Sequence, residues 1–362
     1  MYNRYTRREF VKIATSAVPM TASSLLYPLN VFGPAKPNSR IHGVQIGVIT
    51  YSFMGVAPAD MIPAMVKIGL SEVELMSNHA ESLAGAPVVN QKFGTLGSTP
   101  SGPQTLNADG LLPRCANMQI TASPGGGRGR GSLTSEQQAA QEKLMQWRAA
   151  ATPQTWAPVR KMFADAVIDL HVLCYNMNVS ITDWEIDYAF QMAKALGVKA
   201  ISSSSTVTVA KRVAPVAEKY QMLWGGHGHD DIDDSEQFAT PDTFRKIMSF
   251  SKYIGVNLDI GHFTAAGFDA VAFIKENHDR ITNLHLKDRK RSKDFGVTRS
   301  NNAINNYPWG QGDTPIKEVL KLMKAEKCLF PANIEYEYGC RATGDSIAEV
   351  AKCYEYAKTA LA

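Results

Sequence analysis

The sequence predicts a (β/α)8 TIM barrel, and three features of the chain support this fold. From Val44 onward, short runs rich in β-forming residues alternate with runs of helical hydrophobic period. Several of the β-forming runs are continuous apolar stretches, as expected for parallel strands that are buried on both faces. Eight such alternations over roughly 320 residues fit a single closed barrel with its helices outside.

The predicted strands share short length and enrichment in Val, Ile and Leu, and they cover residues 44–52, 72–76, 169–175, 199–203, 221–225, 255–260, 281–286 and 331–336. The predicted helices cover residues 59–68, 158–167, 183–196, 207–220, 241–251, 268–277, 314–326 and 346–360. A doubly wound sheet is the alternative fold. It is disfavoured because Thr50-Tyr51-Ser52-Phe53 stands after the first strand, where that fold carries a glycine-rich phosphate loop.

One segment, residues 94–157, does not fit the repeat and is predicted to be a long insertion after the second strand. It contains the run Gly125-Gly126-Gly127-Arg128-Gly129-Arg130-Gly131, followed by a stretch rich in Gln and Ala that is typical of a helix. In a barrel such an insertion emerges at the catalytic face. A surface loop, a lid and a contact to an anionic ligand are all compatible with this composition.

Net charge argues against one class of function. The chain has 362 residues with 38 Lys+Arg against 34 Asp+Glu, a formal charge of +4. The first 35 residues carry a local charge of +3, so the remainder carries about +1 (4 minus 3). A body this close to neutral has no general attraction for a polyanion, which excludes nucleic-acid binding through bulk charge.

The N-terminus resembles a bacterial twin-arginine (Tat) export signal. Arg7-Arg8 precedes a mildly apolar stretch over residues 13–32 that prolines and hydroxyl residues interrupt. This stretch is too polar for a membrane span of about 20 apolar residues. We therefore expect residues 1–35 to be an export signal read by the Tat machinery. Residues 36–362 are expected to form one barrel domain, a periplasmic protein without a membrane span.

Polar residues follow the predicted strands at the end where a barrel of this kind carries its function. Five of the eight histidines stand at such strand ends, namely His79, His227, His229, His262 and His285. Carboxylates accompany them at Glu74, Asp259, Glu335 and Glu337, and a lysine does so at Lys287. Histidines scattered through a core would not gather at the ends of strands, so the pattern indicates a functional site.

These motifs resemble the xylose isomerase-like family of sugar-phosphate isomerases and epimerases, in particular its exported branch. The motifs that carry the resemblance are Val-Gln-Ile-Gly at 44–47, Val-Glu-Leu-Met at 73–76, His-Gly-His at 227–229, Asp-Ile-Gly-His at 259–262, His-Leu-Lys-Asp at 285–288, Gly-Gln-Gly-Asp at 310–313 and Ile-Glu-Tyr-Glu at 334–337. The resemblance implies a carbohydrate substrate and a homo-oligomer, and it covers nearly the whole body of the chain.

The resemblance also implies one divalent metal ion at the barrel mouth. Three of the family's four ligands carry over as Asp259, His285 and Glu335, while His227 stands where the family has a glutamate. His229 is an alternative ligand to His227. Two imidazoles and two carboxylates suit Mn²⁺, Co²⁺, Fe²⁺ or Zn²⁺ better than Mg²⁺.

The expected reaction is proton abstraction beside the carbonyl of a keto-sugar, through a metal-stabilised enediolate. Glu335 is the first candidate for the base, with Glu74 and Glu337 in reserve. Lys287 is a candidate to hold a substrate oxygen, and His262 to donate or shuttle a proton. The remaining strand-end residues are predicted to bind substrate, namely His79, His229 and Glu337.

Three alternatives stay open. His227 in the place of a glutamate favours a lyase or dehydratase that eliminates from a 3-keto-glycoside, because histidine protonates a leaving oxygen well. A sugar-binding protein with a degenerate site is a different class. An endonuclease of the same barrel superfamily is disfavoured, because its multi-zinc cluster needs more ligands and basic DNA-facing loops.

Overall fold

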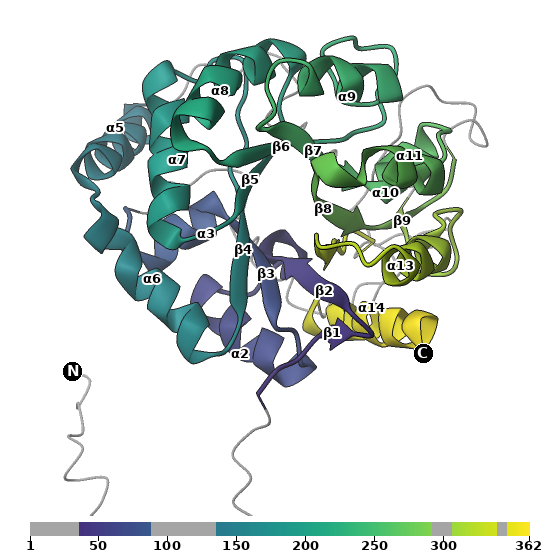
Figure 1. Ribbon diagram of the computed structural model, residues 1–362. Helices are drawn as coiled ribbons and strands as arrows, with labels where there is room; N and C mark the ends of the chain where they lie inside the picture. Colours follow the sequence, from purple (N-terminus) through teal and green to yellow (C-terminus); the bar gives the residue numbers. More distant parts are fainter. Residues whose placement is uncertain (1–35, 88–134, 292–305, 339–345) are drawn as a thin grey trace, which may run out of the picture. The chain divides into compact units, whose positions relative to one another are not determined.

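A computed structural model of the chain describes residues 36–87, 135–291, 306–338 and 346–362 (Figure 1). The predicted export signal at 1–35 lies outside these residues, so its assignment stays a prediction. No helix within the described ranges is long and apolar enough to span a membrane.

Eight parallel strands close into the predicted barrel. In order around the barrel they are β2 (Val44–Ile49), β3 (Glu72–Met76), β4 (Asp169–Cys174), β5 (Ala200–Ser203), β6 (Leu223–His227), β7 (Ile254–Asp259), β8 (Ile281–Leu286) and β11 (Ala332–Ile334). The barrel closes because β2 pairs in parallel with both β3 and β11. The fold class predicted from the sequence is confirmed, and the carboxyl ends of all eight strands meet at one mouth.

Helices surround this barrel, as Figure 1 shows. The longer ones are α2 (Pro58–Ile68), α5 (Ser135–Ala150), α6 (Pro153–Asp165), α7 (Asp183–Leu196), α8 (Val207–Tyr220), α9 (Pro241–Met248), α11 (Ala270–Asn277), α13 (Ile316–Ala325) and α14 (Ser346–Leu361). Shorter elements stand at strand ends, namely η1 (Thr50–Ser52), α3 (Ser77–Leu83), α10 (Ile260–Ala265) and η2 (His278–Arg280). Two short ribbons complete the set: β1 (Arg40–Ile41) pairs antiparallel with β2, and β9 (Asp288–Arg289) with β10 (Asn306–Tyr307).

Local sequence signals set many of these boundaries. At the start of α7, the Thr182 hydroxyl accepts the N–H of Glu185, whose carboxylate in turn accepts the Thr182 N–H. The same helix ends at Gly197, whose φ of 79° places it in the left-handed region that favours glycine.

Several predicted boundaries differ from the structure by two to five residues, and two of these shifts have a clear local cause. Helix α6 begins at Pro153 rather than at Pro158, because Thr152 and Thr155 form a capping box and Pro158 is accommodated inside the helix. Strand β6 covers Leu223–His227 rather than 221–225, because Gln221 caps α8 in the left-handed conformation. The shift places His227 within the strand, facing the barrel.

The predicted insertion at 94–157 is described only from Ser135 onward, so its glycine-arginine run lies outside the described residues. Its helical part is confirmed as α5 and the start of α6. Helix α5 is anchored to α3 through Arg148, whose Nε and Nη2 donate to the two carboxylate oxygens of Glu81 at 2.7 and 2.9 Å. Tyr188 donates to the same carboxylate at 3.0 Å.

The interior of the barrel is unusually polar. Barrels of this kind are normally filled by branched apolar side chains, but here Glu72, Glu74 and asparagines from β7, β8 and β11 point inward. Asn333 donates to Glu72 at 2.9 Å, and Asn283 donates to Glu74 at 2.7 Å. Glycine is required at Gly47, where a Cβ would lie 1.4 Å from Glu72 Oε2.

Candidate metal centre

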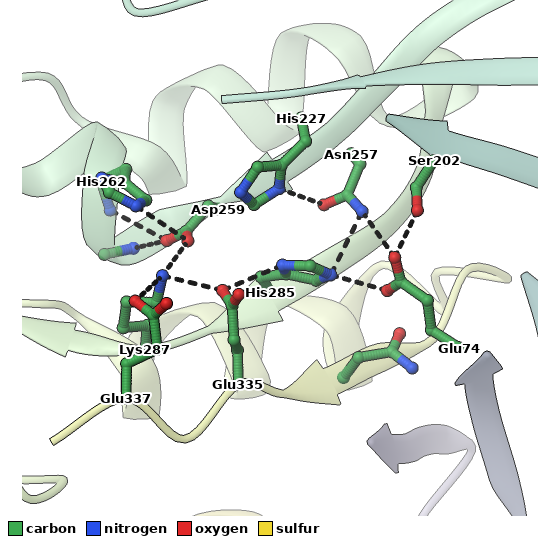
Figure 2. Close-up of polar contacts among 12 residues, drawn as sticks. Glu74, Ser202, His227, Asn257, Asp259, His262, His285, Lys287, Glu335 and Glu337 are labelled. Atoms are coloured by element: carbon green, nitrogen blue, oxygen red, sulfur yellow. Dashed lines mark hydrogen bonds and ion pairs between the residues drawn. The ribbon is translucent and has the colours of Figure 1, made fainter. Parts of the chain in front are cut away.

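Four of the predicted ligands meet at the mouth of the barrel. His227 ends β6, Asp259 ends β7, His285 lies on β8 and Glu335 follows β11. One ligand atom from each lies within 4.8 Å of every other, and all four residues are buried. Figure 2 shows the cluster and its polar contacts. Parallel register explains the convergence, because Asp259 pairs with His285 and His285 pairs with Asn333, two residues before Glu335.

Asp259 carries an oxygen directed at this cluster. Its Oδ1 caps α10 by accepting the N–H groups of Gly261 at 2.8 Å and His262 at 2.9 Å. Its Oδ2 is buried and, within the described part of the chain, accepts no well-formed hydrogen bond, although Lys287 Nζ lies 2.9 Å away. A buried carboxylate oxygen in this position fits a metal ligand.

His285 is held between two carboxylates. Its Nε2 lies 2.6 Å from Glu74 Oε2, and its Nδ1 lies 3.0 Å from Glu335 Oε2. Burial alone would lower the pKa of His285, but these two carboxylates raise it well above its ordinary value. With its Nε2–H donated to Glu74, His285 directs Nδ1 towards the ligand cluster, an arrangement common among metal-binding histidines. Because the raised pKa keeps a proton on Nδ1 in the metal-free protein, an ion bound there would displace that proton.

The carboxylate of Glu74 is fully engaged by donors. In addition to His285, it accepts hydrogen bonds from the Ser202 hydroxyl, from Asn257 Nδ2 at 3.3 Å and from Asn283 Nδ2 at 2.7 Å. The sequence made Glu74 a reserve base. The structure places it behind His285, where its contacts suit an orienting role.

We therefore expect Glu74→Gln to weaken metal binding about 10- to 100-fold, because the amide is a poorer acceptor for His285 Nε2–H. Titration of the metal-free protein with Mn²⁺, followed by electron paramagnetic resonance, measures the change. Glu142→Gln, on the exposed surface of α5, is the matched control. An unchanged affinity in Glu74→Gln would show that His285 does not depend on this carboxylate.

Lys287 supplies a permanent positive charge to the site. Its Nζ lies 2.9 Å from Asp259, 2.8 Å from Glu335 and 2.7 Å from Glu337. Burial alone would lower the pKa of Lys287, but these three carboxylates raise it well above its ordinary value. Lys287 is therefore an ammonium ion at neutral pH, able to stabilise an anionic oxygen but not to act as a base.

The two histidines at the end of β6 and just after it, His227 and His229, are neutral. Burial, assisted by His285, lowers the pKa of His227 to about 4, so its imidazole offers a lone pair to a metal at neutral pH. The ring of His229 lies 5.0 Å from that of His227 and 5.3 Å from that of His262. Burial and these two neighbours lower the pKa of His229 well below its ordinary value.

The other predicted site residues lie around this cluster. His262 Nε2 is 3.8 Å from Asp259 Oδ2, and Asn306 donates to Glu337 at 3.2 Å. His79 instead contacts Thr50, with Nδ1 2.9 Å from the hydroxyl oxygen, and burial lowers its pKa to about 4. In the described part of the chain, the hydrogen-bond partner of the His79 ring is Thr50 and not a residue of the ligand cluster.

Sequence reasoning missed several residues that contact the site. The Tyr51 phenol hydrogen-bonds Glu337, and burial together with the charge of Glu337 raises its pKa. Asn257, Asp230 and Arg289 also contact predicted site residues. Tyr51 could have been found from the sequence, because it is a polar residue at the carboxyl end of a strand, and the other candidates were chosen for that reason.

The four candidate ligands fit a divalent transition metal. Two imidazoles with two carboxylates form a borderline-soft donor set, to which Zn²⁺, Fe²⁺, Co²⁺ and Mn²⁺ are better suited than Mg²⁺. The buried Oδ2 of Asp259 and the neutral imidazole of His227 both favour a cation here. The identity of the ion stays a prediction.

Comparison with known proteins agrees with this fold. Residues 185–356 match the xylose isomerase-like TIM barrel family. The structure resembles the probable 3-DHS dehydratase AsbF, involved in petrobactin synthesis, from Bacillus anthracis (TM-score 0.53, 13% identity, covering 84% of this chain and 97% of that one). It also resembles an IolI protein with a bound zinc atom (TM-score 0.53, 13% identity, covering 87% of this chain and 98% of that one). A third similar structure is a sugar phosphate isomerase/epimerase from Parabacteroides distasonis (TM-score 0.50, 15% identity, covering 89% of this chain and 96% of that one). A search of curated proteins gives no match.

Proposed function

We propose that the protein is a metal-dependent isomerase or epimerase acting on a keto-sugar, because residues 185–356 match the xylose isomerase-like TIM barrel family. The observation that carries the proposal is the buried set of His227, Asp259, His285 and Glu335, whose ligand atoms lie within 4.8 Å of one another. A divalent ion held there would polarise a substrate carbonyl and a neighbouring hydroxyl.

Two residues of this chain are assigned the remaining steps, proton abstraction and binding of the enediolate oxygen. Burial alone would raise the pKa of Glu335, but Lys287 and His285 lower it well below its ordinary value, so its carboxylate is ionised. Glu335 takes the proton from the carbon beside the carbonyl, and the electron pair of the broken C–H bond forms the enediolate. The Lys287 ammonium holds the enediolate oxygen. Return of the proton to the adjacent carbon gives isomerisation, and its return to the opposite face gives epimerisation.

Elimination from a 3-keto-glycoside is the second candidate, and His227 in the place of a glutamate favours it. Symmetrical epimerisation uses two carboxylates on opposite faces of the substrate, and His227 stands at the position from which the family supplies the second one. In the elimination, a base removes the proton beside the ketone, the C–O bond to the aglycone breaks, and an imidazole protonates the leaving oxygen. His262 lies beside the cluster and is the candidate for this acid, because burial lowers the pKa of both His227 and His229 and leaves them neutral. Relatives in the fold bear both isomerase and dehydratase names, so the fold does not separate the two reactions.

The choice of a free sugar over a sugar phosphate rests on the predicted export signal. Phosphorylated sugars are scarce outside the cytoplasm, so a protein carried by the Tat machinery to the periplasm would meet free keto-sugars or oxidised glycosides. The periplasmic localisation and the homo-oligomer are likewise proposals, which rest on the sequence and on the family resemblance.

The test of the proposal is metal content, measured on protein purified without chelators. One transition-metal ion per chain is expected, and Asp259→Ala or Glu335→Ala should lose it. Asp242→Ala, whose side chain is 87% exposed on α9, is the matched control and should keep it. No bound metal, even after incubation with Mn²⁺ or Co²⁺, would overturn the proposal in favour of a sugar-binding protein. Several ions per chain would favour an endonuclease.

Product analysis by NMR then separates the two candidate reactions. The metal-loaded protein is incubated with free ketoses and with 3-keto-glycosides. A rearranged sugar with its glycosidic bond intact would support isomerisation or epimerisation. An unsaturated sugar with a released aglycone would exclude it and establish the lyase.

A further inference from the structure

The four candidate ligands occupy one half of the barrel mouth. They come from β6, β7, β8 and the residue after β11, and these strands are neighbours in the closed sheet. Strand β4 lies opposite, four strands from β8 in either direction around the barrel (Figure 1). A sugar whose carbonyl side is held at the candidate metal centre therefore extends its remaining hydroxyls over the half formed by β2, β3, β4 and β5.

Strand β4 continues beyond its last residue, Cys174, as an extended segment beside β5. The N–H of Tyr175 donates to the carbonyl oxygen of Ser202 at 2.9 Å, and the N–H of Met177 donates to that of Ser204 at 3.2 Å. This spacing of two residues preserves the pleat, so side chains continue to alternate between the two faces of the barrel wall. Asn176 lies between these two bonds and shares a face with Cys174.

That face is the inside of the barrel. Cys174 contacts the hydroxyl of Ser202, which donates to Glu74 in the barrel interior. The alternate residues pack instead in the main apolar core, namely Leu173, Tyr175 and Met177. Asn176 therefore points into the mouth, one layer closer to its opening than Cys174.

The orientation of the Asn176 amide is fixed by its neighbours. Its Oδ1 accepts the N–H of Ser204 at 2.8 Å and the thiol of Cys174 at 3.7 Å. A backbone N–H can only donate, so the amide oxygen and not the NH2 group faces Ser204. Among the described residues, no acceptor contacts Nδ2. Asn176 is half-buried, so its two N–H donors are open to a molecule in the mouth.

We propose that Asn176 is a specificity-determining residue, whose Nδ2 donates to a sugar hydroxyl remote from the carbonyl. The placement of the sugar rests on the proposed function, but the inference does not depend on which reaction follows. A bound sugar that lacks this hydroxyl leaves a fixed donor unpaired once water is excluded. The site therefore discriminates against such a deoxy sugar.

The experiment measures binding of D-fructose and of methyl 3-keto-β-D-glucopyranoside, each with its monodeoxy forms, to the full chain by titration in saturation-transfer NMR, with and without Zn²⁺. The wild type should bind at least one deoxy sugar about 3- to 10-fold more weakly than its parent. In Asn176→Ala the parent should weaken by the same factor while that deoxy sugar is unaffected, so the preference disappears. Asn176→Ser is a second variant with the same expectation.

Asn178→Ala is the matched control, because Asn178 lies on the same loop and its Oδ1 likewise accepts a backbone N–H, that of Ser180 at 2.9 Å, at an exposed site. It should keep the wild-type preference. A general structural disturbance would weaken parent and deoxy sugars equally, whereas loss of one donor removes the difference between them. A preference that persists in Asn176→Ala, or a wild type without any preference, would overturn the inference.

Turnover is recorded on the same samples, so that the two proposals fail separately. Sugars that bind with the Asn176-dependent preference but are not converted would reject the proposed reaction and keep the inference. Conversion with a preference that Asn176→Ala does not change would reject the inference alone. If neither parent sugar binds the wild type, the inference falls together with the proposed substrate class.

Discussion

Replacing Lys287 by methionine is expected to lower the free energy of unfolding of the metal-free protein by about 3–5 kcal/mol. The ammonium lies within 3 Å of Asp259, Glu335 and Glu337, and its side chain is 3% exposed. Without it, three carboxylates remain close together and buried, and their mutual repulsion is opposed mainly by His285. Either the fold accepts this charge or the carboxylates take up protons, and both cost free energy.

Urea unfolding of the chelator-treated protein measures the loss. Lys290→Met is the matched control, because Lys290 makes a more exposed ion pair with Asp313 at 3.1 Å and should contribute less than about 1 kcal/mol. Added Zn²⁺ or Mn²⁺ should raise the stability of Lys287→Met at least as much as that of the wild type, since the ion supplies positive charge to Asp259 and Glu335. If Lys287→Met unfolds at the same urea concentration as Lys290→Met, the three carboxylates do not depend on Lys287.

Replacing Glu72 by glutamine is expected to stabilise the protein at neutral and alkaline pH. Burial, together with the negative charge of Glu74, raises the pKa of Glu72 well above its ordinary value, and its Oε1 has no hydrogen-bond partner among the residues that the structure describes. The unfolded chain releases this proton near the ordinary value, while the folded protein keeps it. The native state therefore loses up to about 1.4 kcal/mol per pH unit, from the unfolded pKa until the pH passes the folded pKa.

Glutamine removes this pH dependence because it does not ionise in either state. The difference in unfolding free energy between Glu72→Gln and the wild type should be small at about pH 5 and should grow in favour of the variant towards about pH 8. Glu276→Gln, exposed at the end of α11, is the control and should show a flat difference. A variant that gains nothing at alkaline pH would mean that Glu72 is already ionised in the native protein.

The barrel and the gathering of the candidate ligands could be predicted from the sequence. Alternating strand and helix signals predict parallel strands, and parallel strands in a closed barrel bring their carboxyl ends to one mouth. A polar residue that ends a strand is therefore placed there by topology alone. This reasoning placed His227, Asp259, His285 and Glu335 at the mouth with the other strand-end residues, and the resemblance to the family singled them out as ligands.

The partners of those residues depended on tertiary structure. Glu74 and His285 are 211 positions apart, and only register and side-chain rotation place their atoms at 2.6 Å, which sets Glu74 behind the histidine rather than facing a substrate. The clustering of Lys287 with three carboxylates and the contact of Asp230 with His262 depend on the same long-range packing. Local pattern specifies which end of a strand a residue occupies. It does not specify which side chain from another strand its atoms contact, because that is decided by barrel closure and by the burial of charge.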